Sequence, residues 1–205
     1  MIVFGISLSP YSRKALTFLG EKGIAYEHRP VTPHDTSPDF KAASPVGKIP
    51  ALVDGDYRLS DSSAICHYLE RKYPNPSLFP SSPDEVGRML WLEEFSDTLL
   101  VPAHSKVFFQ LVIQPNIFKK QPDMSIVDQA LTKELPPLLT YLDSQISGPF
   151  LVGGKLTLAD IAVYPPLLNL KTAGHPVDAQ RYPKLSNYFA GLLARPAFAA
   201  VKYPF

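Results

Sequence analysis

The chain passes from a strand to a helix within its first dozen residues, Ile2-Val3-Phe4-Gly5-Ile6-Ser7-Leu8-Ser9-Pro10-Tyr11-Ser12. Residues 2–4 form an apolar run that favours a strand. A serine followed by a proline is typical of a helix N-terminus, and apolar side chains then recur at helical spacing to about residue 23. Residues 25–29 alternate like a second strand. Together these segments predict a βαβ unit.

A hairpin and a second helix complete this part of the chain. Residues 50–53 and 57–59 predict two short strands, and Asp54-Gly55-Asp56 between them is a strong signal for an antiparallel turn. Apolar side chains three and four residues apart predict a helix over 62–72. The order βαβ, a variable segment and then ββα predicts an α/β domain with one mixed sheet of four strands.

The chain changes character once, at a stretch rich in proline and serine. Residues 74–83 contain four prolines and three serines, a composition typical of a linker. Beyond it, helical spacing predicts helices over 85–109, 126–145, 157–168 and 185–193, and no strand. We therefore predict an N-terminal domain over 1–78, a linker over 79–84 and an all-helical domain over 85–205.

Composition and charge exclude several classes of protein. Of 205 residues, 45 % are hydrophobic and 19 % are charged, which excludes an intrinsically disordered chain. The net charge of +1 argues against a nucleic-acid partner or a polybasic membrane anchor, and no apolar run is long enough for a membrane span. A single cysteine, Cys66, excludes a dithiol redox centre and, with no export signal recognised, predicts a cytoplasmic protein. The five histidines lack the spacing of a metal site.

The segment Ser9-Pro10-Tyr11-Ser12 stands where the glutaredoxin pattern Cys-Pro-Tyr-Cys would place a redox pair, with hydroxyls in place of both thiols. The simplest interpretation is a helix cap. The alternative is a site that stabilises the thiolate of a ligand, because a helix N-terminus offers free amides and a partial positive charge. Lowering the pKa of a thiol by about 2 needs roughly 2.7 kcal/mol, and one charge-assisted hydrogen bond supplies about 1.5–3 kcal/mol.

Four segments of the chain resemble the soluble glutathione S-transferases, over essentially its whole length. Residues 9–14 are similar to the serine-type active-site segment of the phi, tau and zeta classes and many bacterial members. Residues 45–52 are similar to the NPxGKVPxL segment, with Ser44 where Asn is usual, and residues 59–65 to the LxES-x-AI segment, with Asp for Glu. Residues 156–162 are similar to the capping-box segment of the helical domain.

The resemblance implies a thioredoxin-like N-terminal domain, followed by an all-helical domain. It also implies a transferase that activates glutathione, its co-substrate, for attack on a small hydrophobic electrophile. Ser9, with Ser12 as the alternative, would donate its hydroxyl to the thiolate. The residues assigned to glutathione binding are Lys48, Ile49, Pro50, Asp61 and Ser62.

Each of these binding residues has a specific implied role. The Ile49–Pro50 bond would be cis and would present the backbone of Ile49 to the cysteinyl unit. Asp61 and Ser62 would hold the γ-glutamyl end, besides capping the helix that they open. Lys48 is either an exposed lysine or a partner of a glutathione carboxylate.

The second substrate would lie between the two domains, where small-molecule sites are common. Tyr11 would form one wall, and His104, Phe108 and Phe109 the other. The resemblance also implies a homodimer in which the long helices meet across a two-fold axis.

Three alternative functions stay open. One is a glutathione-dependent isomerase that returns glutathione unchanged, although the zeta pattern Ser-Ser-Cys-Ser is absent. A thiol–disulfide reductase would need a cysteine at position 9 or 12, where the chain has serines. The third is a non-catalytic binding or assembly module on the same fold.

Overall fold

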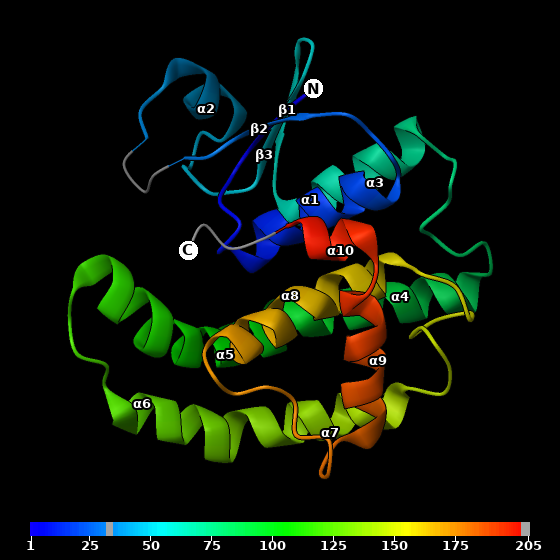
Figure 1. The fold of residues 1–205 in the computed structure, drawn as a ribbon. Helices are drawn as coiled ribbons and strands as arrows, with labels where there is room; N and C mark the ends of the chain where they lie inside the picture. Colours follow the sequence, from blue (N-terminus) through cyan, green and yellow to red (C-terminus); the bar gives the residue numbers. More distant parts are fainter. Residues whose placement is uncertain (32–34, 202–205) are drawn as a thin grey trace. The chain divides into compact units, whose positions relative to one another are not determined.

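The computed structural model describes residues 1–31 and 35–201, which form two compact units (Figure 1). The first unit comprises Met1–Phe79 together with the chain from Arg195 onward, and the second comprises Pro80–Ala194. The division after Phe79 lies inside the segment 79–84 that we predict as a linker. Our prediction extended the helical domain to residue 205, but residues 195–201 belong to the first unit; residues 202–205 lie outside the described part of the chain.

Helix packing and an ion pair attach this last segment to the first unit. Helix α10 (Pro196–Ala200) packs on helix α1 (Pro10–Glu21), where a Cβ at Gly20 would lie only 3.0 Å from the Cβ of Ala197. The Arg195 guanidinium donates two hydrogen bonds, of 3.0 and 2.6 Å, to the Glu21 carboxylate. The partners are 174 residues apart in sequence, so no local pattern could have paired them.

A four-stranded mixed sheet forms the centre of the first unit and confirms the predicted fold class. Strand β1 (Ile2–Phe4) pairs in parallel with β2 (Glu27–Arg29) and antiparallel with β3 (Ala51–Asp54). Strand β4 (Tyr57–Ser60) pairs antiparallel with β3, which gives the order β2-β1-β3-β4. Helices α1 and α3 (Ser62–Lys72) lie side by side (Figure 1).

The sheet contributes buried residues in alternation. Val3 and Leu52 are fully buried, while Phe4 and Ala51 belong to a separate apolar cluster with helix α2 (Pro38–Ala43). Helix α2 lies in the variable segment, for which we predicted no structure. It contributes Phe40 and Ala43 to the cluster and thereby sets where the following loop begins.

A buried ion pair anchors the end of α1 to the end of α3. The Lys22 ammonium lies 2.6 Å from the Glu70 carboxylate and donates to the carbonyl oxygens of Tyr73 and Pro76, each at 2.7 Å. The Ser77 hydroxyl donates to the same carboxylate at 2.7 Å. These bonds tie the first residues of the proline-rich stretch to the first unit.

The second unit is all-helical within its described residues. Its first helical run is continuous from residue 83 to residue 118, so it begins two residues before the predicted 85–109 and ends nine residues after it. The run ends where Lys119 adopts a left-handed φ of 55°. It comprises α4 (Pro83–Phe95), the π-helical η1 (Ser96–Leu100), α5 (Val101–Phe108) and the π-helical η2 (Phe109–Phe118).

The remaining helices lie close to their predicted ranges. They are α6 (Met124–Gln129), the π-helical η3 (Ala130–Glu134), α7 (Leu135–Gln145), α8 (Leu158–Thr172) and α9 (Pro183–Leu193). Helix α8 is buried along most of its length, and it opens with the predicted capping box of Thr157 and Asp160. Asp160 also accepts hydrogen bonds from the Leu151 amide and the Tyr188 hydroxyl, which joins α8 to α9.

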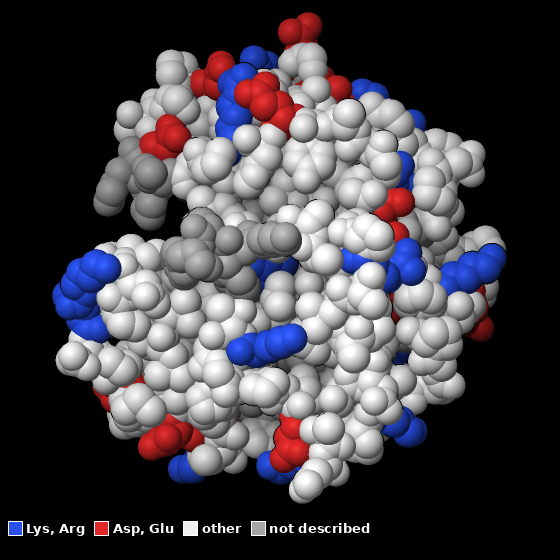
Figure 2. All heavy atoms as spheres, in the orientation of Figure 1, with Lys and Arg blue, Asp and Glu red and all other residues white. Residues whose placement is uncertain are grey.

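Acidic and basic side chains are scattered among one another on the face shown in Figure 2, as the small net charge suggests. No helix in the described part of the chain is both long and apolar enough to cross a membrane.

Candidate active site

Three of the predicted site segments meet at one end of the sheet. The register aligns Phe4 of β1 with Ala51 of β3, and Ala51 with Ser60 of β4. The chain therefore leaves β1 at Gly5, enters β3 from Pro50 and leaves β4 at Asp61, all at the same edge. A Cβ at Gly5 would lie 3.9 Å from the Cα of Pro50, which shows how closely two of the segments approach.

Ser9 caps helix α1, as predicted. Its backbone is extended, with φ −72° and ψ 125°, and its hydroxyl oxygen accepts a hydrogen bond from the Ser12 amide at 3.3 Å. A hydroxyl carries one hydrogen and two lone pairs, so the cap leaves the hydrogen available for a second partner. Ser9 is partly exposed, and a thiolate at the helix N-terminus can reach it.

Ser12 lies in a different environment, although it is only one helical turn away. Its side chain is fully buried, and its hydroxyl oxygen has no hydrogen-bond partner among the described residues. A Cβ at Gly5 would lie 2.5 Å from this oxygen, so the hydroxyl points at the backbone beside β1. This burial separates the two serines that the sequence left as alternatives.

The loop before β3 contains the predicted cis bond. The Ile49–Pro50 peptide is cis, which confirms that prediction, and Pro50 is buried while Ile49 is partly exposed. Lys48 is exposed, and no ion pair to it occurs among the described residues. The Lys48 ammonium can therefore meet a ligand carboxylate without giving up a partner in the chain.

Asp61 and Ser62 open helix α3, as predicted. The Asp61 carboxylate accepts a hydrogen bond from the Ala64 amide at 3.0 Å. Its backbone has a φ of 83°, a region that non-glycine residues rarely adopt and that is found at ligand-binding sites. Asp61 is exposed, whereas Ser62 is 2 % exposed. The exposed carboxylate offers acceptors for an ammonium group, and the free amides of the helix N-terminus offer donors for a carboxylate.

Sequence reasoning missed two buried cations beneath this edge. Arg13 and Lys14 are 0 % and 1 % exposed, although they follow Ser9 and Ser12 in the first turns of helix α1. The Arg13 guanidinium donates to the carbonyl oxygen of Ser7, and the Lys14 ammonium donates to the hydroxyl of Ser63 at 3.0 Å. These bonds join helix α1 to the loop before it and to the first turn of α3. The sequence signal that could have indicated their burial is the pair of adjacent charged residues within a helix pattern that is otherwise apolar.

The residues predicted for the second substrate have different surroundings. Tyr11 is half-buried in the first turn of α1. His104 is fully buried, with its two ring nitrogens 3.2 Å from the carbonyl oxygen of Leu100 and 3.2 Å from the amide nitrogen of Asn169. These contacts lie within the helical unit and favour a structural role for His104. Phe108 is also buried, at 5 % exposure.

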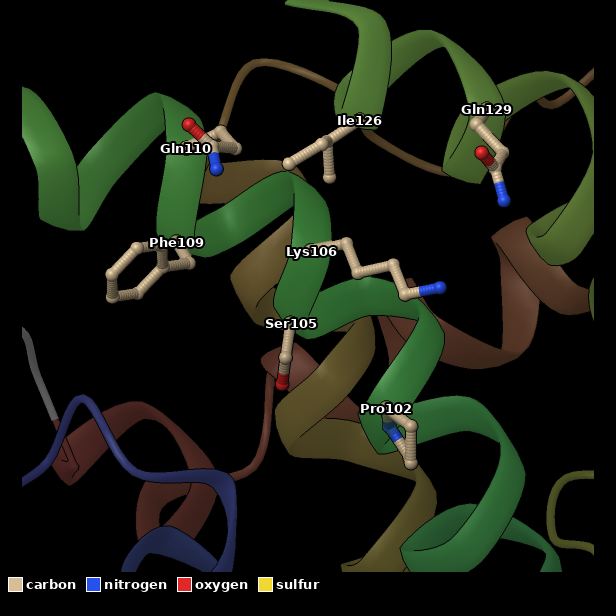
Figure 3. Close-up of a pocket in the computed structure, with 7 residues that line it drawn as sticks. All are labelled: Pro102, Ser105, Lys106, Phe109, Gln110, Ile126 and Gln129. Carbon is tan, nitrogen blue, oxygen red and sulfur yellow. The ribbon is translucent and has the colours of Figure 1, made fainter. Parts of the chain in front are cut away.

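A pocket of about 510 Å³ occurs on the helical unit, and Phe108 is not among the residues that line it (Figure 3). It includes the neighbouring Phe109, which is 42 % exposed, and Ile126 of α6. At its polar side, the Lys106 ammonium is neutralised by the Glu134 carboxylate at 2.7 Å. The lining residues are Pro102, Ser105, Lys106, Phe109, Gln110, Ile126 and Gln129. The pocket is thus mainly apolar and has the size of small-molecule sites.

Metal ligation has no candidate in this part of the chain. No three His, Cys, Asp or Glu side chains gather in a metal-binding arrangement within residues 1–31 and 35–201.

Comparison with known proteins gives the same family for both units. The model of the glutathione S-transferase N-terminal domain matches residues 3–77, and that of the C-terminal domain matches residues 100–196. Glutathione S-transferase 3 of Zea mays is 33 % identical, over 98 % of this chain and 95 % of its own length. A probable glutathione S-transferase of Oryza sativa subsp. japonica is 31 % identical, over 96 % and 93 %.

A solved structure agrees with these relatives. Glutathione S-transferase I bound with lactoylglutathione superimposes with a TM-score of 0.88 at 27 % identity, covering 98 % of this chain and 97 % of its own. The sequence relatives and the family models extend over both units, and the fold is the same. The chain belongs to the glutathione S-transferase family.

Proposed function

We propose that this glutathione transferase uses Ser9 to stabilise the thiolate of glutathione for attack on a small hydrophobic electrophile. The observation that supports this assignment is that the loop leading from β1 to Ser9, the Ile49–Pro50 loop and the Asp61–Ser62 pair all adjoin one end of the sheet. A tripeptide thiol needs a donor for its sulfur, backbone partners for its middle residue and charged partners for its ends. This edge offers all three.

Ser9 can act on the thiolate without losing its structural role. Its oxygen accepts the Ser12 amide, and its hydrogen donates to the sulfur. The thiol proton leaves to solvent as glutathione binds. The sulfur lone pair then forms the bond to the electrophilic carbon, and the leaving group departs with its bonding electrons. One charge-assisted hydrogen bond of about 1.5–3 kcal/mol, with about 0.3–2 kcal/mol from the helix N-terminus, covers the roughly 2.7 kcal/mol that a pKa lowered by 2 requires.

The rest of glutathione would be bound along the same edge. The Asp61 carboxylate suits the ammonium of the γ-glutamyl end, and the Ser62 amide and hydroxyl suit its carboxylate. The Ile49 backbone would pair with the cysteinyl unit. Lys48 would meet a glutathione carboxylate as an exposed, salt-sensitive contact.

We assign the apolar part of the second substrate to the pocket lined by Phe109 and Ile126 on the helical unit. Phe109 and Ile126 offer it aromatic and aliphatic surface (Figure 3). His104 contributes by holding α5 to α8 through Asn169, because its ring is buried.

A cytoplasmic homodimer is part of the same proposal. The long helical run carries exposed apolar side chains at Leu90, Trp91 and Leu99, which are 37 %, 47 % and 44 % exposed. These exposed apolar side chains favour a contact in which the same surface of two copies of the chain meets across a two-fold axis. Sedimentation at micromolar concentration tests this, since a mass near 23 kDa for the single chain would contradict it.

The test of the function is an ultraviolet difference titration of the protein with glutathione, following thiolate absorbance against pH. A bound thiol that titrates well below the free value near 8.5 is the expected result. Glutathione bound with an unchanged pKa would indicate a carrier, and no binding at all would remove the enzyme assignment. A screen of aryl and alkyl halides then identifies the electrophile.

A further inference from the structure

The buried side chain of Ser44 controls the loop that precedes the cis bond. Ser44 follows helix α2 and is 0 % exposed. Its hydroxyl donates to the carbonyl oxygen of Lys48 at 2.6 Å, and its carbonyl accepts from the Gly47 amide at 2.9 Å. Its own amide donates to the carbonyl of Phe40 at 2.7 Å. All the polar groups of Ser44 are therefore used to close one turn against the end of α2.

The rest of this turn has few contacts of its own. Residues 45–48 are all exposed, and the Val46 side chain is 77 % exposed. Gly47 has a φ of 72°, so the turn depends on a left-handed residue as well as on the hydroxyl. The hydrogen bond from the Ser44 hydroxyl to the Lys48 carbonyl oxygen spans this turn.

Fixing the Lys48 carbonyl also fixes the amide of Ile49. The two groups belong to one planar trans peptide, in which the C=O and the N–H point in opposite directions. The Ser44 hydroxyl binds the carbonyl from the buried side. The Ile49 N–H is thereby directed away from Ser44, on the opposite side of the peptide plane.

We infer that Ser44 is a positioning residue for glutathione, which aims the Ile49 amide at the cysteinyl unit through its hydrogen bond to the Lys48 carbonyl. The inference rests on the proposed function, because it needs the Ile49 backbone to bind the tripeptide. Ser44 does not touch the substrate. Its effect should appear in glutathione affinity, and the chemical step at Ser9 should be largely preserved.

The test compares Ser44→Ala with Ser44→Asn, and uses Ser37→Ala as the matched control. Asn keeps a side-chain donor, whereas Ala removes it. Ser37 lies at the other end of α2, is exposed and makes no side-chain cap bond. Calorimetric titration with glutathione, steady-state kinetics with an aryl halide and thermal unfolding are measured for each variant.

Ser44→Ala should weaken glutathione binding by about 3- to 10-fold, the effect of losing one neutral hydrogen bond. The KM for glutathione should rise by the same factor, while kcat at saturating glutathione changes by less than about 2-fold. Ser44→Asn should recover most of the affinity, and Ser37→Ala should match the wild type. If Ser44→Ala does not fold, Ser44→Cys replaces it, because a thiol keeps the volume but is a weak donor.

The outcomes separate this inference from the proposed function. A wild-type protein that does not bind glutathione would contradict the proposed function itself. If the wild type binds glutathione and a folded Ser44→Ala or Ser44→Cys variant has the same affinity, the positioning role is wrong. A loss confined to kcat, with KM unchanged, would overturn it as well.

Discussion

The substitution Ser9→Ala should separate two roles that the structure gives to one oxygen atom. The hydroxyl accepts the Ser12 amide as a helix cap, and it is the proposed donor to the glutathione thiolate. Alanine removes both interactions. The first loss affects the free energy of unfolding, and the second affects the pKa of bound glutathione, so each can be measured alone.

The structure sets the size of both effects. The cap bond is long, at 3.3 Å, which places its loss at the low end of the range, about 0.5–1 kcal/mol. A charge-assisted hydrogen bond of about 1.5–3 kcal/mol corresponds to a pKa change of about 1 to 2. If the bound thiol titrates near 6.5 in the wild type, its thiolate fraction at pH 7 falls by about 3- to 25-fold in the variant. Glutathione affinity should change little, because the tripeptide keeps its other contacts.

The assay is the ultraviolet difference titration of wild type and variant, with urea unfolding of both. Ser12→Ala is the matched control, because its hydroxyl is buried and has no hydrogen-bond partner among the described residues. That control should keep the thiol pKa and should be as stable as the wild type or slightly more so. A raised pKa in Ser12→Ala together with an unchanged one in Ser9→Ala would refute the reasoning.

Three further predictions concern the stability of the first unit. Gly5→Ala should cost about 1–3 kcal/mol by thermal unfolding, because the new Cβ would lie 2.5 Å from a buried hydroxyl oxygen. Lys22→Met should cost about 3–5 kcal/mol in urea, since it leaves the Glu70 carboxylate buried without its cation; a loss under 1 kcal/mol would contradict this. The hydrogen bond from Lys72 lowers the pKa of Asp54 below 3.8, so the folded state binds this proton less readily than the unfolded state. This interaction therefore adds to the free energy of unfolding above pH 3.8, and its contribution is lost as the pH falls below that value. Asp54→Asn should flatten this part of the plot of unfolding free energy, measured in urea, against pH.

Local sequence signals were sufficient for most elements of the fold. The Ser-Pro start of α1, the Asp-Gly turn between β3 and β4 and the capping box of α8 act over four or five residues. Their chemistry is complete within the segment that carries it, so the sequence predicts them directly. The α/β order and the later run of helical spacing then determine the fold class.

Other features depended on residues far apart in sequence. Helix α2 is short and gains its place from the apolar cluster around Phe40, and α10 gains its place from α1. The long helical run passes through π-helical turns and continues to Phe118, beyond the end that apolar spacing predicted at residue 109. Short helices have weak intrinsic signals, because most helix stability comes from tertiary packing.

The sequence by itself determined which chemical groups are available: a serine at a helix N-terminus, a turn that ends in Pro50 and an acidic residue that opens α3. Only the tertiary structure decided which of these groups meet and which are accessible. Strand register brings Gly5, Pro50 and Asp61 to one end of the sheet, and the fold buries Ser12 and His104. Whether a side chain can donate or accept a hydrogen bond is set by its residue type. Its burial and its distance from other groups depend on how segments far apart in the sequence pack together.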